Sequence, residues 1–214
     1  MLTLYGFSRV NSFARGRTRE LRVMWALEEM GVPYRVRGLD HPAHELNTEA
    51  YRRLSPFEQI PSIDDDGVVV SESGAILLYL ARKSGKLIPA DELGQTQVVR
   101  WCFAALNTVE LPMIYVDQLR FAVKEDPAAK QLDAMMEWAR LRVKHLERWL
   151  KDREYVATDE FTIADILMSL VLSEIDDATL YDPYPRVREY REHCKSRPAW
   201  KKSIEAYCDY VETA

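Results

Sequence analysis

The chain has 214 residues, enough for one large domain or two small ones with a substantial hydrophobic core. Hydrophobic residues make up 47% of it and charged residues 29%, as in ordinary globular proteins. The formal net charge of −5 argues against a general nucleic-acid-binding protein. We therefore expect a globular protein that does not bind nucleic acid.

The sequence also indicates a reducing compartment away from membranes. No apolar run approaches the roughly 20 residues that span a bilayer. The first residues, 1–5, lack the basic region and apolar core of a secretory signal. The three cysteines, Cys102, Cys194 and Cys208, are scattered, so they predict neither a disulfide framework nor a metal site. We expect a cytoplasmic protein with no membrane segment and no metal.

The first 83 residues alternate between strand and helix patterns. The expected order is a strand at 2–7, a helix at 18–30, a strand at 33–39, a short helical or irregular stretch at 47–54, a hairpin at 61–70 and a helix at 73–83. Between the first strand and the first helix lies a polar, arginine-rich loop, residues 8–17, and Gly31 is expected to end that helix.

The rest of the chain is predicted to be helical. Helices are expected at 95–119, 132–151, 163–173, 187–193 and 198–210. The stretch 163–173 is nearly all apolar, which predicts a buried central helix. These patterns predict an α/β domain at 1–83, a linker at 84–93 and an all-α domain at 94–214.

The buried helix has a strong start signal. Thr162 is expected at the N-cap and Asp165 three residues later, so each side chain can accept a hydrogen bond from the other's backbone N–H. Phe161 and Ile166 are spaced to form a hydrophobic staple. We interpret this motif as a folding element without a catalytic role.

Two motifs in the first domain indicate a receptor for a short peptide. An X-Pro bond has only a small trans preference, so Ile60-Pro61 can be cis and offer the Ile60 backbone to a bound peptide. Glu72 and Ser73 stand at the start of a helix, where free N–H groups attract carboxylates. The alternative interpretation of Ser73 is a simple helix cap.

Four segments in order together resemble the cytosolic glutathione S-transferase family, in its bacterial branch. They are Ile60-Pro61 with Glu72-Ser73, the Phe-Thr-Ile-Ala-Asp cap at 161–165, the segment 184–200, and the segment 21–34. The resemblance covers nearly the whole chain. It implies a thioredoxin-like domain with a mixed four-stranded sheet, an all-helical domain, glutathione as substrate and a homodimer.

The resemblance assigns roles to the two motifs. Ile60 would pair with the cysteinyl backbone of glutathione, and Pro61 would be the cis residue that shapes this contact. Ser73 would hold the γ-glutamyl carboxylate, and Glu72 would take the γ-glutamyl amine.

Other positions of the expected glutathione site match the family pattern less closely. Gln59 occupies a position that often touches glutathione in the family, and His44 lies where a side chain often meets the glycyl carboxylate. Glu58 replaces the usual Gly of this turn and Ser55 replaces the usual Asn, so the turn departs from the family pattern.

The thiol of glutathione has a pKa near 8.5, so its activation requires a hydrogen bond to sulfur and positive potential. Gly6 fills the place of the family's usual Tyr, and Tyr5 would face the other side of the strand. Thr18 matches the family's serine best, with Ser12 and Asn11 as rivals. Thr18 is alternatively the N-cap of the first helix.

Five arginines of the first domain lie near this loop, at positions 9, 15, 17, 19 and 22. Most are interpreted as a solvated face, while Arg15 or Arg17 is a candidate for binding a glutathione carboxylate.

For a second substrate, the resemblance points to the first long helix of the second domain. Trp101, Met113 and Tyr115, with Asn107, are candidates for a pocket, although such residues more often belong to a core.

The sequence leaves two functional hypotheses. The first is an enzyme that conjugates glutathione to a small hydrophobic electrophile. The second is a non-catalytic interaction or regulatory protein that reuses the fold.

Overall fold

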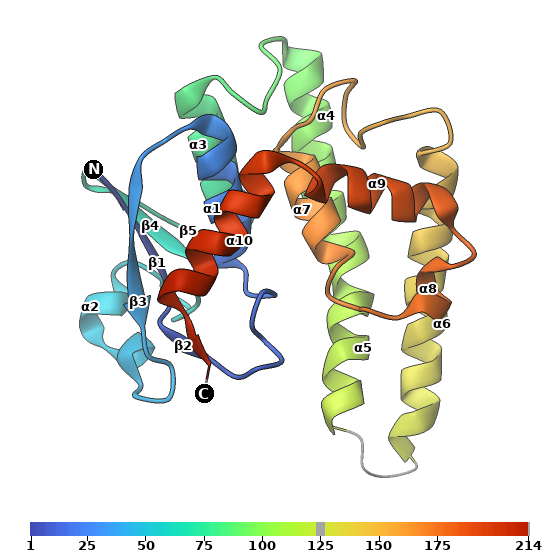
Figure 1. Cartoon of the computed structure of the whole chain (residues 1–214), viewed down its shortest axis with the longest axis horizontal. Coiled ribbons are helices and arrows are strands. Elements are labelled where there is room, and N and C mark those ends of the chain that lie inside the picture. Colours follow the sequence, from blue (N-terminus) through green and yellow to red (C-terminus); the bar gives the residue numbers. More distant parts are fainter. Residues whose placement is uncertain (123–126, 214) are drawn as a thin grey trace. The chain divides into compact units, whose positions relative to one another are not determined.

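The structure is a computed structural model that describes residues 1–122 and 127–213 (Figure 1). It contains two compact units. The first is Met1–Leu87 together with the residues from Arg197 onward, and the second is Ile88–Ser196. The expected division at 1–83, 84–93 and 94–214 placed the last helix in the all-α domain, whereas here that helix belongs to the first unit and packs against its first helix.

The first unit contains the mixed four-stranded sheet that the resemblance implies. Its strands lie in the order β3-β1-β4-β5. Their bounds are Leu2–Phe7 for β1, Tyr34–Leu39 for β3, Ser62–Asp65 for β4 and Val68–Ser71 for β5. Strand β1 pairs parallel with β3 and antiparallel with β4, and β4 pairs antiparallel with β5. The expected strands and the hairpin are therefore confirmed.

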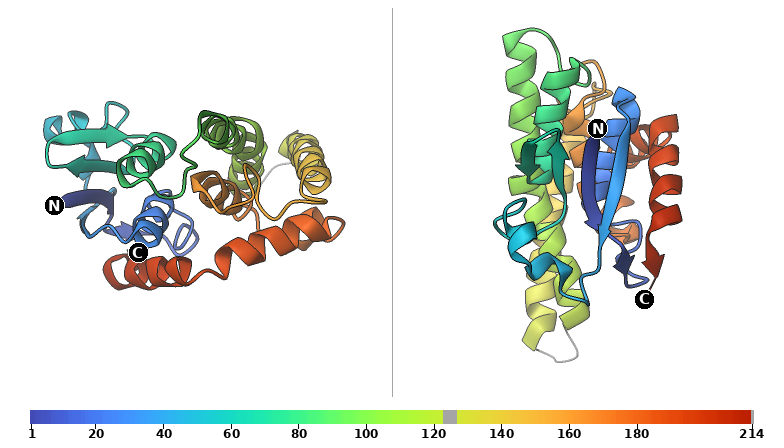
Figure 2. Two further views of the ribbon diagram at one scale, coloured as in Figure 1. Left: turned by 90° about the horizontal axis from the view of Figure 1, so that it is seen from above. Right: turned by 90° about the vertical axis from the view of Figure 1, so that its left-hand side faces the viewer.

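Helix α1 is the centre of the first unit. It contacts β1 and the helices α3 and α10, and α10 lies beside it in Figures 1 and 2. The helices are α1 (Glu20–Met30), α3 (Ser73–Ser84), α10 (Pro198–Tyr210), the short α2 (Glu49–Arg52) and the 3₁₀ turn η1 (Glu45–Asn47). Trp25 of α1 is fully buried, with its ring 4.9 Å from that of Trp200. Gly31 ends α1 with φ of 68°, as expected from glycine's tolerance of this region.

The first unit also holds a small second sheet. Strand β2 (Arg9–Val10) pairs parallel with β6 (Glu212–Thr213) at the carboxy-terminal end of the described chain. The sequence predicted only a loop at 8–17, because a two-residue strand is too short to show a period-2 pattern.

The second unit is helical. Its elements are α4 (Glu92–Phe103), the π-helical turn η2 (Ala104–Val109), α5 (Glu110–Ala122), α6 (Pro127–Trp149), α7 (Ile163–Val171), α8 (Ala178–Tyr181) and α9 (Pro185–Lys195). The helix expected at 95–119 is thus α4 and α5 joined by η2. All of α7 is buried, and Thr162 and Asp165 form the predicted capping box at its start. In the described ranges, no helix has the length and apolar character needed to cross a membrane.

Candidate functional site

The turn before β4 presents an unpaired stretch of backbone. The Ile60–Pro61 peptide bond is cis, as predicted. The Tyr51 hydroxyl donates to the Gln59 carbonyl at 2.9 Å, and the Gln59 N–H donates to the Ser55 Oγ at 3.0 Å. Neither the N–H nor the C=O of Ile60 bonds to another described residue, while its side chain is buried. The Ile60 backbone is therefore available to a ligand that runs alongside it.

The two departures in this turn have a structural explanation. Glu58 adopts a φ of 55°, the region that glycine enters most easily. Its carboxylate bonds at 2.5 Å to both Arg52 and Asn47, and these bonds hold the residue in place. Ser55 supplies the oxygen that accepts the Gln59 N–H. Glu58 and Ser55 therefore both support this turn through hydrogen bonds of their side chains.

Two adjacent residues at the start of α3, Glu72 and Ser73, favour ligand groups of opposite charge. Glu72 is exposed, has a φ of 69° and makes no capping hydrogen bond with its side chain. Ser73 is 6% exposed, and its Oγ accepts a hydrogen bond at 3.3 Å from the guanidinium of Arg22, which is 1% exposed. The helix N-terminus and the buried arginine favour an anion beside Ser73, whereas Glu72 favours a cation. An ammonium and a carboxylate carried by one ligand carbon match this pair.

Thr18 makes a different contact from the expected helix cap. The N-cap of α1 is Arg19, so the interpretation of Thr18 as N-cap is wrong. The Thr18 hydroxyl instead donates to the hydroxyl of Tyr207 on α10 at 2.9 Å. Sequence reasoning missed this contact because 189 residues separate the two side chains.

The rival loop residues have varied surroundings. Ser12 is exposed, and the Asn11 side chain accepts the Ala14 N–H at 2.8 Å in a local turn. The Arg17 guanidinium lies 4.6 Å from the Phe13 ring centroid. Arg15 bonds to carbonyls of the carboxy-terminal segment, including that of Val211 at 2.8 Å. Arg15 is therefore engaged within the protein.

The two remaining candidates for glutathione contacts, Gln59 and His44, are exposed. Gln59 has an exposed side chain whose amide donates to the Phe57 carbonyl at 3.3 Å. His44 is exposed with a φ of 59° and precedes η1. Both remain predictions as ligand contacts.

Comparisons with known proteins agree with this arrangement. The family model of the glutathione S-transferase N-terminal domain matches residues 21–83, and that of the C-terminal domain matches residues 112–198. Glutathione S-transferase D7 of Anopheles gambiae is 30% identical over 181 residues, covering 81% of this chain and 79% of the relative. The chain belongs to the glutathione S-transferase family.

Solved structures of the family are similar over nearly the whole chain. A glutathione transferase from Burkholderia graminis, with two glutathione molecules per subunit, has a TM-score of 0.85 at 26% identity and covers 96% of this chain and 88% of its own. One from Pseudomonas putida, with one glutathione disulfide per subunit, has a TM-score of 0.84 at 25% identity, with coverages of 95% and 90%. The thioredoxin-like and helical fold is therefore shown, while the bacterial branch stays a prediction.

Beside Thr18, this family member buries a carboxyl group that the sequence did not point out. Glu20 is fully buried, one of its oxygens accepts the Phe7 N–H at 3.2 Å, and the other has no hydrogen-bond partner among the described residues. Burial raises its pKa from 4.5 to about 7, against the opposing effect of its own N–H, the Phe7 N–H and the Thr18 hydroxyl. A glutamate at a helix start is ordinarily a surface residue, so no local pattern predicts the burial of Glu20.

The three pocket candidates of the helical unit have separate environments. Met113 is fully buried, and Tyr115 is 49% exposed on the same helix. Two residues apart on a helix means roughly 200° of rotation, so these two side chains point in nearly opposite directions. Trp101 is half-buried, with its ring 5.1 Å from that of Trp149. The structure therefore places Met113 in the core, and the three do not form one pocket wall within this unit.

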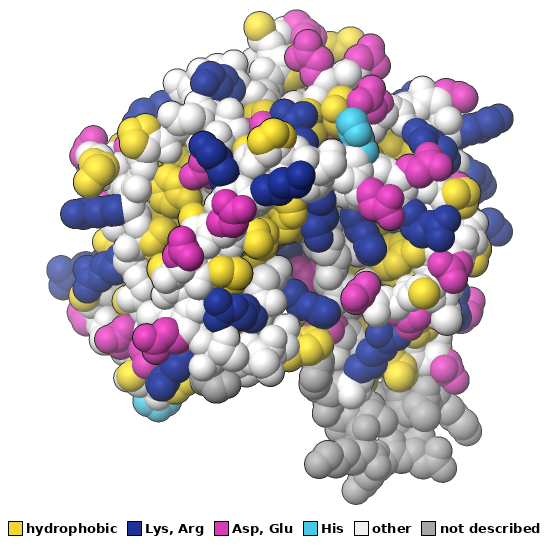
Figure 3. Space-filling model, in the orientation of Figure 1, with side chains coloured by type: hydrophobic (Ala, Val, Ile, Leu, Met, Phe, Trp, Pro, Cys, Tyr) yellow, Lys and Arg dark blue, Asp and Glu magenta, His cyan; other side chains and the backbone are white. Residues whose placement is uncertain are grey.

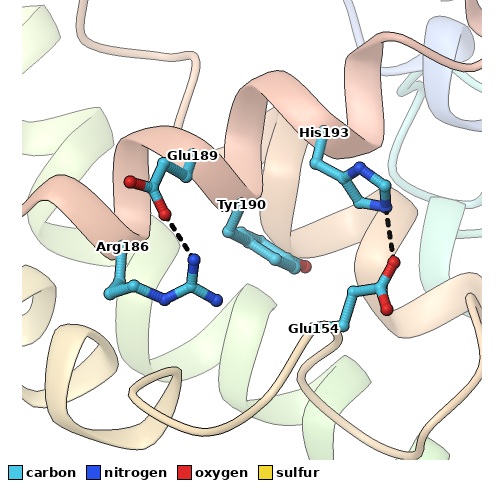
Figure 4. A pocket seen from close by; sticks show the side chains of 5 residues that line it. All are labelled: Glu154, Arg186, Glu189, Tyr190 and His193. Atoms are coloured by element: carbon cyan, nitrogen blue, oxygen red, sulfur yellow. Dashed lines mark hydrogen bonds and ion pairs between the residues drawn. The ribbon is translucent and has the colours of Figure 1, made fainter.

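A cavity of about 250 Å³ lies along α9 in the helical unit (Figure 4). Its polar side chains pair mostly with one another: Glu154 with His193 at 2.9 Å, and Arg186 with Glu189. Tyr190 donates its hydroxyl to the buried Asp165 at 3.0 Å. These internal pairs satisfy the polar lining, so we interpret the cavity as structural.

The described residues offer no clear site for nucleic acid or for a metal ion. On the face in Figure 3, described basic side chains lie among acidic ones and form no continuous basic track. Among residues 1–122 and 127–213, no cluster of three His, Cys, Asp or Glu could hold a metal ion.

Proposed function

We propose that this protein is a glutathione S-transferase that joins the glutathione thiolate to a small hydrophobic electrophile, as a cytoplasmic homodimer. One observation carries the proposal: the exposed Glu72 next to Ser73, the α3 N-terminus and the buried Arg22 guanidinium. This pair complements the ammonium and carboxylate of a γ-glutamyl group. Membership in the family and the glutathione in the related bacterial structures support the same ligand.

The chemistry follows from the position of the peptide. With the γ-glutamyl group at Glu72 and Ser73, the cysteinyl backbone pairs with Ile60. The thiol loses its proton to solvent, and the thiolate attacks the electrophilic carbon. A sulfur–carbon bond forms while the leaving group departs with its electron pair. The protein contributes thiolate formation and positioning.

The test has three stages: retention on immobilised glutathione, the thiolate absorbance of bound glutathione against pH, and conjugation to chlorodinitrobenzene. We expect retention, a bound thiol pKa below about 8.5, and turnover. Failure to retain the protein would contradict the proposal at its first step.

A second candidate is a glutathione-binding protein without catalysis. The Thr18–Tyr207 hydrogen bond favours it, because the one hydroxyl hydrogen of Thr18 already has an acceptor. Retention with an unshifted thiol pKa and no turnover would identify this function.

A further inference from the structure

The hydroxyls of Thr18 and Tyr207 form a pair where the loop reaches α1. Thr18 donates to Tyr207 at 2.9 Å. The Tyr207 ring is buried. The hydroxyl of Thr18, the predicted thiol-activating residue, is therefore held in a defined position by Tyr207.

The segment that carries Tyr207 is firmly attached to this loop. Strand β6 pairs with β2, and the Glu212 N–H donates to the Ser8 carbonyl at 2.9 Å. Arg15 bonds at 2.8 Å to the Val211 carbonyl and at 3.0 Å to that of Cys208. These contacts order both partners of the hydroxyl pair before any ligand arrives, which lowers the entropic cost of using them.

We propose that Tyr207 is a positioning residue for thiolate formation: with glutathione bound, its hydroxyl donates to Thr18, which donates in turn to the glutathione sulfur. This inference rests on the proposed function. Only the two O–H bonds rotate, and the thiol proton leaves to solvent. Because hydrogen bonds in a chain polarise one another, a Thr18 that accepts from Tyr207 is a stronger donor to sulfur than Thr18 alone.

The charges around Tyr207 are compatible with a neutral phenol. Burial raises its pKa, the buried Glu20 acts in the same direction, and the Thr18 hydroxyl, the Gly16 backbone and Arg15 act against it. Tyr207 therefore keeps its hydrogen at neutral pH and can donate it.

Tyr210 provides a matched control on the same helix. Its ring lies 5.7 Å from that of Tyr207, but its hydroxyl approaches the Met24 sulfur at 3.9 Å instead of Thr18. Tyr207→Phe and Tyr210→Phe therefore each remove one hydroxyl from one buried region, and only the first removes the contact with Thr18.

The experiment follows the thiolate absorbance of bound glutathione against pH in the full-length wild type and both variants. We expect Tyr207→Phe to reduce the thiolate fraction at pH 6.5 by about 1.3-fold to fourfold, because roughly 10–30% of the strength of a hydrogen bond to a charged group is lost, with retention on immobilised glutathione unchanged. Tyr210→Phe should match the wild type. Thr18→Val should lower the thiolate fraction at least as much as Tyr207→Phe does, and Thr18→Ser should have the wild-type fraction. The Thr18→Val/Tyr207→Phe double variant should have the same thiolate fraction as Thr18→Val.

Each result has one meaning. A Tyr207→Phe variant with the wild-type thiolate titration overturns the inference and leaves the proposed function standing. Equal losses in Tyr207→Phe and Tyr210→Phe overturn it in favour of a packing effect. A wild type without a shifted thiol overturns enzyme and inference together. If Tyr207→Phe fails to fold, Thr18→Val against Thr18→Ser tests the donor that Tyr207 positions: equal titrations of these two variants show that residue 18 does not donate to sulfur and overturn the inference.

Discussion

At the scale of single residues, Glu20 is the least expected group in the first unit. Its carboxyl is fully buried, with one oxygen bonded to the Phe7 N–H and the other without a described partner. Gly6 leaves the space for it, because a Cβ at position 6 would lie 2.9 Å from the Tyr210 hydroxyl and 3.2 Å from Glu20. A side chain at Gly6 would therefore displace the residues around the thiol-activating loop.

Glu20 makes stability depend on pH. Below pH 4.5 the carboxyl is neutral in the folded and the unfolded chain, but between pH 4.5 and about 7 only the unfolded chain ionises it. Stability should therefore fall over this window by about 3 kcal/mol, and Glu20→Gln should abolish that loss. The measurement is the free energy of unfolding of both proteins at pH 5 and pH 8, with the exposed Glu205→Gln as control. An unchanged difference between wild type and Glu20→Gln across this range would contradict it.

Glu72 should recognise the ammonium of the ligand. We expect Glu72→Gln to weaken glutathione binding by about tenfold or more, the value of a charge-assisted hydrogen bond. A glutathione analogue without the α-amino group should bind wild type and variant equally. Isothermal titration with both ligands checks this, and Asp66→Asn, an exposed carboxylate in the same unit, serves as control. Equal weakening for both ligands would assign Glu72 a structural role only.

At the scale of elements, helix α7 depends on one buried carboxylate. Asp165 accepts hydrogen bonds from the N–H groups of Val156 and Thr162 at 2.9 Å and from the Tyr190 and Thr162 hydroxyls at 3.0 Å. The sequence predicted the bond within the capping box, since it joins residues three apart. The bonds to Val156 and Tyr190 are set by tertiary packing, which brings the loop before α7 and helix α9 to the same side chain.

Asp165→Ala should lower the free energy of unfolding by about 3 kcal/mol or more, because several buried donors lose their acceptor. Urea unfolding measures this, and Asp182→Asn, on an exposed carboxylate of the same unit, should change stability by less than about 0.5 kcal/mol. A loss for Asp165→Ala no larger than the single-cap cost of about 1 kcal/mol would contradict the role of the remaining bonds.

At the scale of the whole molecule, the family leads us to expect a two-fold dimer. Exposed apolar side chains offer surface to a partner copy; they include Leu93, Phe103, Leu111 and Tyr115 of the helical unit. Sedimentation equilibrium should give about twice the 24.9 kDa of one chain at micromolar concentration. A mass of one chain that persists with rising concentration would contradict the dimer.

The sequence by itself determined the order of the main elements, the cis Ile60–Pro61 bond, the capping box of α7 and the family, because periodicity, caps and short motifs are local. Only the tertiary structure decided that α10 joins the first unit, that Thr18 bonds Tyr207, and that Glu20 is buried. The physical reason is distance along the chain: contacts between residues nearly 200 positions apart depend on packing, which no local pattern contains.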